Sequence, residues 1–157
     1  MALTPDVKRA ISGFSRLYKV WEVQSRSEIL TLTGHKSVNP TSVGITIDGK
    51  RAVSESDKTL KIWDLDKRQE LFTLTGHKRY ITAVAITPDA RLAISGSSDQ
   101  TLKVWDLENG RELYTLIGHK HQITAVAMTP DARLAVSGSE DDTLRVWDLG
   151  SGQELRM

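Results

Sequence analysis

The sequence contains no cysteine and no long apolar run. The absence of cysteine excludes disulfide bonds, thiolate metal ligands and a cysteine nucleophile, and it is typical of proteins from a reducing compartment. No stretch approaches the roughly 18 consecutive apolar residues of a membrane-spanning helix. Residues 1–6 also lack the apolar run of a signal peptide. We therefore expect a cytoplasmic protein with no membrane partner.

The chain also has little net charge, because 21 basic and 20 acidic side chains leave a balance of +1. A protein that binds the phosphate backbone of nucleic acid usually carries a clear excess of lysine and arginine. A glycine-rich phosphate loop is missing as well, since Gly150-Ser151-Gly152 falls in a predicted strand turn and not between a strand and a helix. We expect no nucleic-acid partner and no cofactor.

What the sequence does have is a repeat. Its four tryptophans, Trp21, Trp63, Trp105 and Trp147, lie 42 residues apart. Gly-His pairs at 34–35, 76–77 and 118–119 keep the same step, as do Trp-Asp pairs at 63–64, 105–106 and 147–148. Residues 76–115 match residues 118–157 at 28 of 40 positions without a gap. One structural unit therefore recurs nearly four times.

Each unit contains short hydrophobic runs separated by turn residues, a pattern typical of strands. In the best unit we predict strands at 81–86, 91–96, 102–107 and 112–116, which form a four-stranded antiparallel meander. The first of these runs has no polar alternation and is expected to be covered on both faces. Because one small sheet cannot bury both faces, the units must stack on one another.

The Gly-His pair, the Thr-Pro-Asp turn, the Ser-Gly-Ser run followed by Asp, and the closing Trp-Asp make the whole chain resemble the WD40 family. The resemblance implies an all-β fold of β-propeller blades, with residues 1–157 forming one repeat array. The approximate blades are 1–33, 34–75, 76–117 and 118–157, and the last strand is expected at 154–157.

About 3.75 blades per chain would leave broad apolar faces in water. We expect two copies to join head to tail about a two-fold axis and to close an eight-bladed ring as a homodimer. The alternative is that the chain is a segment of a longer propeller.

In the WD40 family a buried histidine, serine, aspartate and tryptophan form a hydrogen-bonded tetrad in each blade. The resemblance assigns this role to His77, Ser95, Asp99 and Trp105, to His119, Ser137, Asp141 and Trp147, and, with a one-residue difference in the loop, to His35, Ser54, Asp57 and Trp63. A Ser-His-Asp set is also the pattern of a hydrolase triad. A catalytic site need occur only once, however, so its recurrence beside a tryptophan favours a structural role. The first unit lacks the full tetrad.

Metal binding is not expected, because His35, His77 and His119 lie one per blade and only His119 and His121 are close in sequence. Lys36, Lys78 and Lys120 follow each Gly-His pair, and they are either solvated loop charges or a basic rim for an acidic partner.

Function is expected where the copies differ. The variable loop positions are Ser37-Val38-Asn39, Arg79-Tyr80 and His121-Gln122, together with the residues before each turn aspartate. In a WD40-like propeller these loops reach one rim around the channel. Our candidates for partner binding are Arg79, Tyr80, His121, Gln122 and Glu140. The expected function is a non-catalytic protein-interaction scaffold, not an enzyme. The alternative is a natural or engineered propeller fragment that self-assembles and has no selected ligand.

Overall fold

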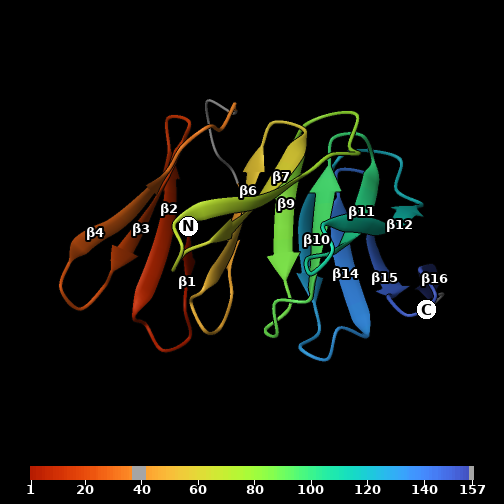
Figure 1. The fold of residues 1–157 in the computed structure, drawn as a ribbon. Coiled ribbons are helices and arrows are strands. Elements are labelled where there is room, and N and C mark those ends of the chain that lie inside the picture. Colours follow the sequence, from red (N-terminus) through yellow and green to blue (C-terminus); the bar gives the residue numbers. More distant parts are fainter. Residues whose placement is uncertain (37–41, 156–157) are drawn as a thin grey trace.

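The computed structural model describes residues 1–36 and 42–155, which form four four-stranded antiparallel sheets and no helix. Figure 1 shows the sheets side by side in chain order, with the N-terminal sheet at one end and the C-terminal sheet at the other. The first sheet holds β1 (Ala2–Leu3), β2 (Arg9–Phe14), β3 (Leu17–Glu22) and β4 (Ser27–Leu32). The second holds β5 (Val43–Ile45), β6 (Arg51–Ser56), β7 (Thr59–Asp64) and β8 (Gln69–Leu74).

The third sheet holds β9 (Ile81–Ile86), β10 (Leu92–Ser97), β11 (Thr101–Asp106) and β12 (Arg111–Ile117). The fourth holds β13 (Ile123–Met128), β14 (Leu134–Ser139), β15 (Leu144–Asp148) and β16 (Gln153–Leu155). The predicted all-β fold of four-stranded meanders is confirmed, and the strands expected at 81–116 agree with β9 to β12 to within one residue at each end. The strand expected at 154–157 is described only to Leu155, because residues 156–157 lie outside the described part of the chain.

The turn between the first two strands of each sheet has the same construction. In the third sheet the Thr87 hydroxyl donates to Asp89 Oδ1 at 2.7 Å and accepts from the Leu92 amide at 3.0 Å. These bonds hold Ala90 at a φ of 58°, a left-handed conformation that non-glycine residues rarely adopt. Val7, Gly49 and Ala132 occupy the same place in the other sheets, also with positive φ. This repeated turn fixes how each first strand enters its sheet.

The hydrophobic core lies between neighbouring sheets. One buried cluster joins Val53, Leu60, Ile62 and Leu74 of the second sheet to Ile81, Ala93, Trp105 and Leu107 of the third. The same repeat positions build the cluster between the third and fourth sheets, and most of them recur between the first and second. The first strands β1, β5, β9 and β13 also lie against one another in chain order. Every sheet therefore depends on its neighbour for burial.

The last sheet exposes the face that its predecessors bury. Leu144 is 70% exposed, whereas Leu60 and Leu102 at the same repeat position are 0% exposed. Val136 is 39% exposed, whereas its counterpart Ile94 is fully buried. At the other end of the array Trp21 is half-buried, whereas Trp105 is almost fully buried. The two end sheets thus carry unpaired halves of one repeated interface.

Two equivalent glycines test this packing. A Cβ added at Gly96 would lie 2.3 Å from Cγ2 of Ile123 in the next sheet, whereas one at Gly138 would lie 3.3 Å from Leu144 Cδ2 and 3.6 Å from Thr124 Oγ1, both in its own sheet. We predict that Gly96→Ala destabilises the monomer by roughly 1–3 kcal/mol through overpacking. Gly138→Ala should leave its stability nearly unchanged. Urea denaturation at a protein concentration that keeps the chain monomeric measures both, and equal losses would contradict the assigned sheet-to-sheet packing.

Candidate functional site

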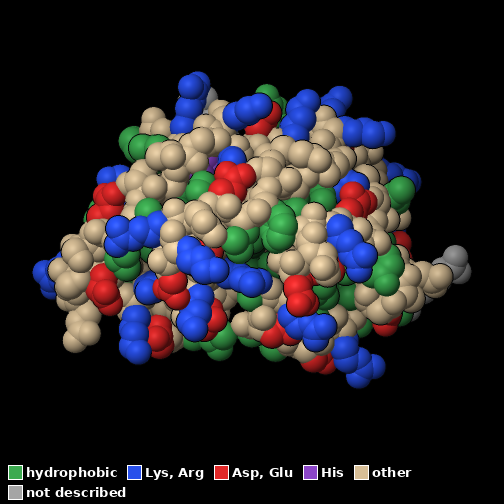
Figure 2. Space-filling view, in the orientation of Figure 1, with side chains coloured by type: hydrophobic (Ala, Val, Ile, Leu, Met, Phe, Trp, Pro, Cys, Tyr) green, Lys and Arg blue, Asp and Glu red, His purple; other side chains and the backbone are tan. Residues whose placement is uncertain are grey.

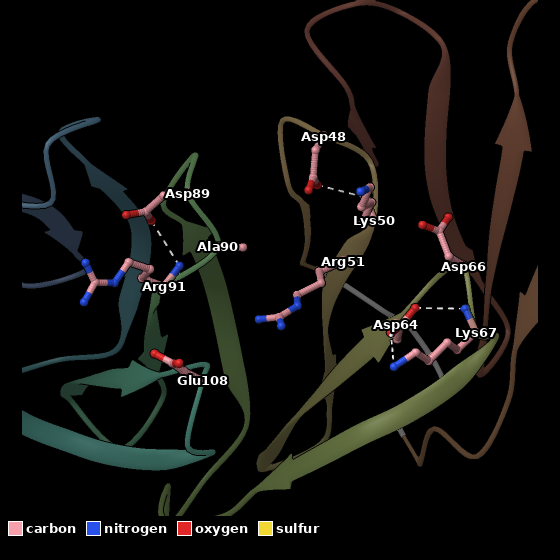
Figure 3. A pocket seen from close by; sticks show the side chains of 10 residues that line it. All are labelled: Asp48, Lys50, Arg51, Asp64, Asp66, Lys67, Asp89, Ala90, Arg91 and Glu108. Carbon is pink, nitrogen blue, oxygen red and sulfur yellow. Dashed lines mark hydrogen bonds and ion pairs between the residues drawn. The ribbon is translucent and has the colours of Figure 1, made fainter.

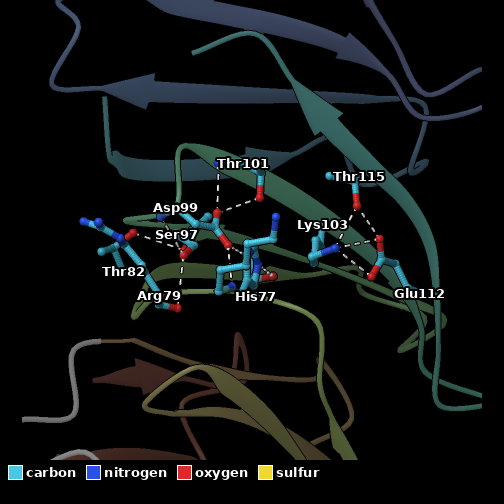
Figure 4. A network of polar contacts seen from close by, with 12 residues as sticks. His77, Arg79, Thr82, Ser97, Asp99, Thr101, Lys103, Glu112 and Thr115 are labelled. Atoms are coloured by element: carbon cyan, nitrogen blue, oxygen red, sulfur yellow. Dashed lines mark hydrogen bonds and ion pairs between the residues drawn. The ribbon is translucent and has the colours of Figure 1, made fainter. Parts of the chain in front are cut away.

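A buried hydrogen-bonded chain of side chains crosses the third sheet. The Trp105 indole N–H donates to Ser95 Oγ at 2.8 Å, and Ser95 Oγ lies 2.8 Å from His77 Nε2. On the other side of the ring, His77 Nδ1 lies 2.9 Å from Asp99 Oδ2. A neutral imidazole with its proton on Nδ1 satisfies every polar atom in this chain. Figure 4 shows His77 and Asp99 within the surrounding polar network.

The fourth sheet repeats the arrangement. Trp147 donates to Ser137 Oγ at 2.9 Å, Ser137 Oγ lies 2.8 Å from His119 Nε2, and His119 Nδ1 lies 2.9 Å from Asp141 Oδ2. The structure therefore brings together all the residues assigned to these two sets. Ser95 and Ser137 are buried and are engaged by both neighbours, so neither hydroxyl has the exposure that a nucleophile needs to meet a substrate.

The aspartates connect three segments of the chain. Asp99 accepts from His77, from the Lys78 amide at 2.8 Å, and from the hydroxyl and amide of Thr101 at 2.6 and 3.0 Å. Burial by itself would raise the pKa of Asp99, but these hydrogen bonds outweigh it and hold the pKa well below the usual range. Sequence reasoning missed Thr101 and its equivalent Thr143, although each follows its aspartate by two residues.

The predicted rim residues lie beside these aspartates, at the end of the sheets that is uppermost in Figure 1. This end is called the upper rim. Tyr80 is 62% exposed, and its carbonyl accepts from the Ser98 amide at 2.9 Å. Gln122 is tied on two sides, since its Oε1 accepts from Ser98 at 3.2 Å and its Nε2 donates to Glu140. The Arg79 and His121 side chains are exposed. The variable loop at Ser37-Val38-Asn39 lies outside the described residues.

The recurring lysines share this end. Lys36, Lys78 and Lys120 are exposed, and none of them has an ion pair within the described residues. Figure 2 shows lysine and arginine side chains gathered along the upper edge of the molecule. A chain with nearly balanced charge therefore presents a basic edge.

The family comparison agrees with this geometry. The WD40 sequence model, described as WD domain, G-beta repeat, matches residues 26–64, 68–106 and 110–148, well over half of the chain. The chain belongs to the WD40 repeat family. A search of curated protein sequences gave no match. WD40 repeats indicate a protein-interaction scaffold role, and WD40 domains are generally non-catalytic.

The second WD40 sheet departs from the tetrad pattern. Trp63 donates to Ser54 Oγ at 2.8 Å, which lies 2.7 Å from His35 Nε2. Asp57, which the sequence analysis assigned to this set, is not brought to His35. Its loop explains why: a two-residue turn, 57–58, joins β6 to β7, whereas a three-residue loop, 98–100, joins β10 to β11. The shorter turn leaves no residue at the position from which Asp99 reaches His77.

A different pair accompanies His35. The Tyr18 ring of the first sheet lies 4.7 Å from the His35 ring, and its hydroxyl donates to the Ser42 carbonyl at 2.9 Å. Glu55, only 2% exposed, lies beside Tyr18, and burial followed by the Glu55 charge raises the pKa of the tyrosine. No repeat signal marks this pair, because glycine stands at the Glu55 position in the later sheets.

The first WD40 sheet retains one link of the chain. The Trp21 indole donates to Ser12 Oγ at 3.0 Å. Ser12 was not predicted from the sequence, although it precedes Trp21 by nine residues, as Ser54 precedes Trp63.

A cavity of about 520 Å³ lies at the opposite end, between the second and third sheets. Figure 3 shows Arg51 reaching into it, with Glu108 and Arg91 on the third-sheet side. Between the first and second sheets, Arg9 stands at the same repeat position as Arg51. It donates to the Gly49 carbonyl at 2.6 Å and lies 3.3 Å from Asp66. The cavity lining mixes both signs of charge and contains none of the rim candidates.

The part of the chain at 1–36 and 42–155 contains no group of three or more histidine, cysteine, aspartate or glutamate side chains placed to hold a metal ion. Within the same residues, no helix has the length and apolarity to cross a membrane.

The hydrogen bonds that Asp99 accepts should contribute to the free energy of unfolding. Asp99→Asn places an amide N–H₂ against the donors that the carboxylate now accepts, so we expect a loss of roughly 1–3 kcal/mol. Asp57→Asn is the matched control, because asparagine tolerates the left-handed conformation of Asp57 and no His35 contact is at stake. Thermal and urea unfolding measure both variants. A control loss as large as that of Asp99→Asn would contradict the assigned network.

The stability of the protein should depend on pH through His35. Burial, with a contribution from Lys61, lowers the pKa of His35 from 6.5 to about 4. The unfolded chain then binds a proton near pH 6.5 while the folded chain stays neutral, so stability falls as the pH is lowered from 6.5 towards 4. We expect the stability difference between wild type and His35→Gln to shrink over this range. Urea unfolding at several pH values checks this, and a constant difference would contradict it.

Proposed function

We propose that this WD40 chain is a non-catalytic protein-interaction scaffold that closes a ring by associating with a second copy of itself. The supporting observation is the repeated interface. At each junction within the chain, one sheet contributes a cluster of aliphatic side chains, joined by Tyr18 in the first sheet, and the next contributes alanine, tryptophan and leucine. In the last sheet, Val136 and Leu144 belong to the aliphatic side of this interface, and both are exposed. The first sheet carries the corresponding second half in Ala10, Trp21 and Val23, all half-buried.

Head-to-tail pairing of two copies would match these halves twice, once at each end of the array. Two chains of four sheets would then form an eight-bladed ring about a two-fold axis. The driving force is burial of apolar side chains, worth about 25 cal/mol for each Å² removed from water. The alternative, in which the face of Val136 and Leu144 packs on further repeats of a longer chain, uses the same complementarity.

We place partner binding on the upper rim, at Arg79, Tyr80, His121, Gln122 and Glu140. Two features support this location: the repeats differ at these positions, and Tyr80 is an exposed aromatic side chain beside exposed cations. Aromatic and arginine side chains commonly anchor protein interfaces. The buried serines of the polar chains argue against hydrolysis as the function.

The mass of the protein in solution tests ring closure. We expect wild type to sediment at twice the 17.5 kDa chain mass and Leu144→Glu to sediment as a single chain, because the charge would be buried at the new junction. Ile117→Glu is the matched control, since Ile117 is 75% exposed and threonine occupies its position in earlier sheets. Wild-type protein that remains a single chain at micromolar concentration would overturn ring closure by two copies.

A further inference from the structure

The second sheet lacks the carboxylate that completes the polar chain of the third and fourth sheets. His77 and His119 both meet an aspartate at Nδ1. His35 is 6% exposed, and its Nδ1 makes no geometrically complete hydrogen bond among the described residues, although the Leu32 carbonyl lies near enough to the ring to oppose the lowering of the His35 pKa. When the Ser54 hydroxyl donates to Nε2, the ring proton lies on Nδ1. An unsatisfied buried donor there costs roughly 1–3 kcal/mol, so an acceptor supplied from outside would be favoured.

A cavity of about 380 Å³ opens beside this histidine on the upper rim. Gly34 and Lys36, the two chain neighbours of His35, both line it. The turn Ser56-Asp57-Lys58-Thr59 forms another wall, and this turn replaces the longer loop that carries Asp99 in the third sheet. Lys36 and Thr59 in this lining are the repeat equivalents of Lys78 and Thr101, which bind Asp99 in the third sheet, whereas the His35 ring adjoins the lining residues without being one of them.

The charges around the cavity favour an anion. Three lysines, Lys36, Lys58 and Lys61, line it together with a single acidic residue, Asp57. Lys61 is paired with Glu70, but Lys36 and Lys58 have no ion pair within residues 1–36 and 42–155. Asp57 is held by its own turn, with φ at 65° and its amide donating to Glu55 at 3.2 Å. Two free ammonium groups thus face one carboxylate.

We propose that this cavity binds a carboxylate, either of a small free acid or of an acidic side chain on a partner. The third sheet provides the precedent within the same chain. There a carboxylate is held by a histidine Nδ1, a lysine backbone amide and a threonine two positions further along. His35, Lys36 and Thr59 are the counterparts in the second sheet. In the second sheet the Lys36 amide already donates to Ser56 Oγ at 2.9 Å. The donors that remain for a ligand are therefore His35 Nδ1–H and the lysine side chains.

Histidine ring resonances provide the test. Acetate is titrated into ¹⁵N-labelled protein at constant ionic strength, and the His35 Nδ1–H signal is followed beside those of His77 and His119. We expect a saturable shift of His35 alone. Lys58→Gln should weaken binding roughly two- to fivefold, the range expected for one exposed ion pair. Lys78→Gln, which removes an equally exposed lysine from the third sheet, should not.

A second variant distinguishes a binding site from general charge screening. Inserting one serine between Ser56 and Asp57 restores the Ser-Ser-Asp order of residues 97–99 and should bring an internal carboxylate to His35. We expect this variant to lose the acetate response and to melt at a higher temperature. The same titration with a capped Gly-Glu-Gly peptide separates the two sources. Tighter binding than acetate supports a partner side chain, and equal binding supports a free acid.

Three outcomes would overturn the proposal. They are the absence of a saturable His35 shift, an equal response to chloride at the same ionic strength, and an undiminished acetate response after the serine insertion. The proposal does not depend on ring closure, so a single-chain mass in solution would leave it standing.

Discussion

Packing between neighbouring sheets is the interaction on which the other features of this structure depend. The three buried clusters each draw side chains from two sheets, so a four-stranded unit has no independent core. A tryptophan lies at every one of these junctions, so that its indole N–H is largely shielded from solvent. The serine and histidine beneath it supply the partners that a buried N–H requires. The polar chain is thus a consequence of apolar packing.

The length of one loop decides whether that polar chain is complete. A three-residue loop in the third sheet, 98–100, and a four-residue loop in the fourth, 140–143, place Asp99 and Asp141 on the histidines. The two-residue turns of the first and second sheets provide no such position. In the second sheet, Tyr18 from the neighbouring sheet lies against His35 and contributes to its burial. A one-residue difference therefore changes the local electrostatics of a whole sheet.

The sequence was sufficient for the features that repeat. The 42-residue step, the strand patterns and the residues around Trp105 and Trp147 all follow from equivalent positions. It was insufficient where a contact depends on a neighbouring sheet or on turn geometry. Asp57 has the right residue type but the wrong loop, and Tyr18 meets His35 only because two sheets pack together. Such contacts have no fixed spacing along the chain.

The same dependence on neighbours governs the lower end of the molecule. Arg9 and Arg51 occupy one repeat position, where the later sheets have Leu92 and Leu134. Arg9 reaches the Gly49 carbonyl and Asp66 of the next sheet, whereas Arg51 faces a cavity beside Glu108. Identical residues at identical positions thus differ in role because the adjoining turns differ. A side chain in this array takes its function from its sheet and the next one together, so joining the end sheets would give Trp21 and Leu144 the partners that their internal counterparts already have.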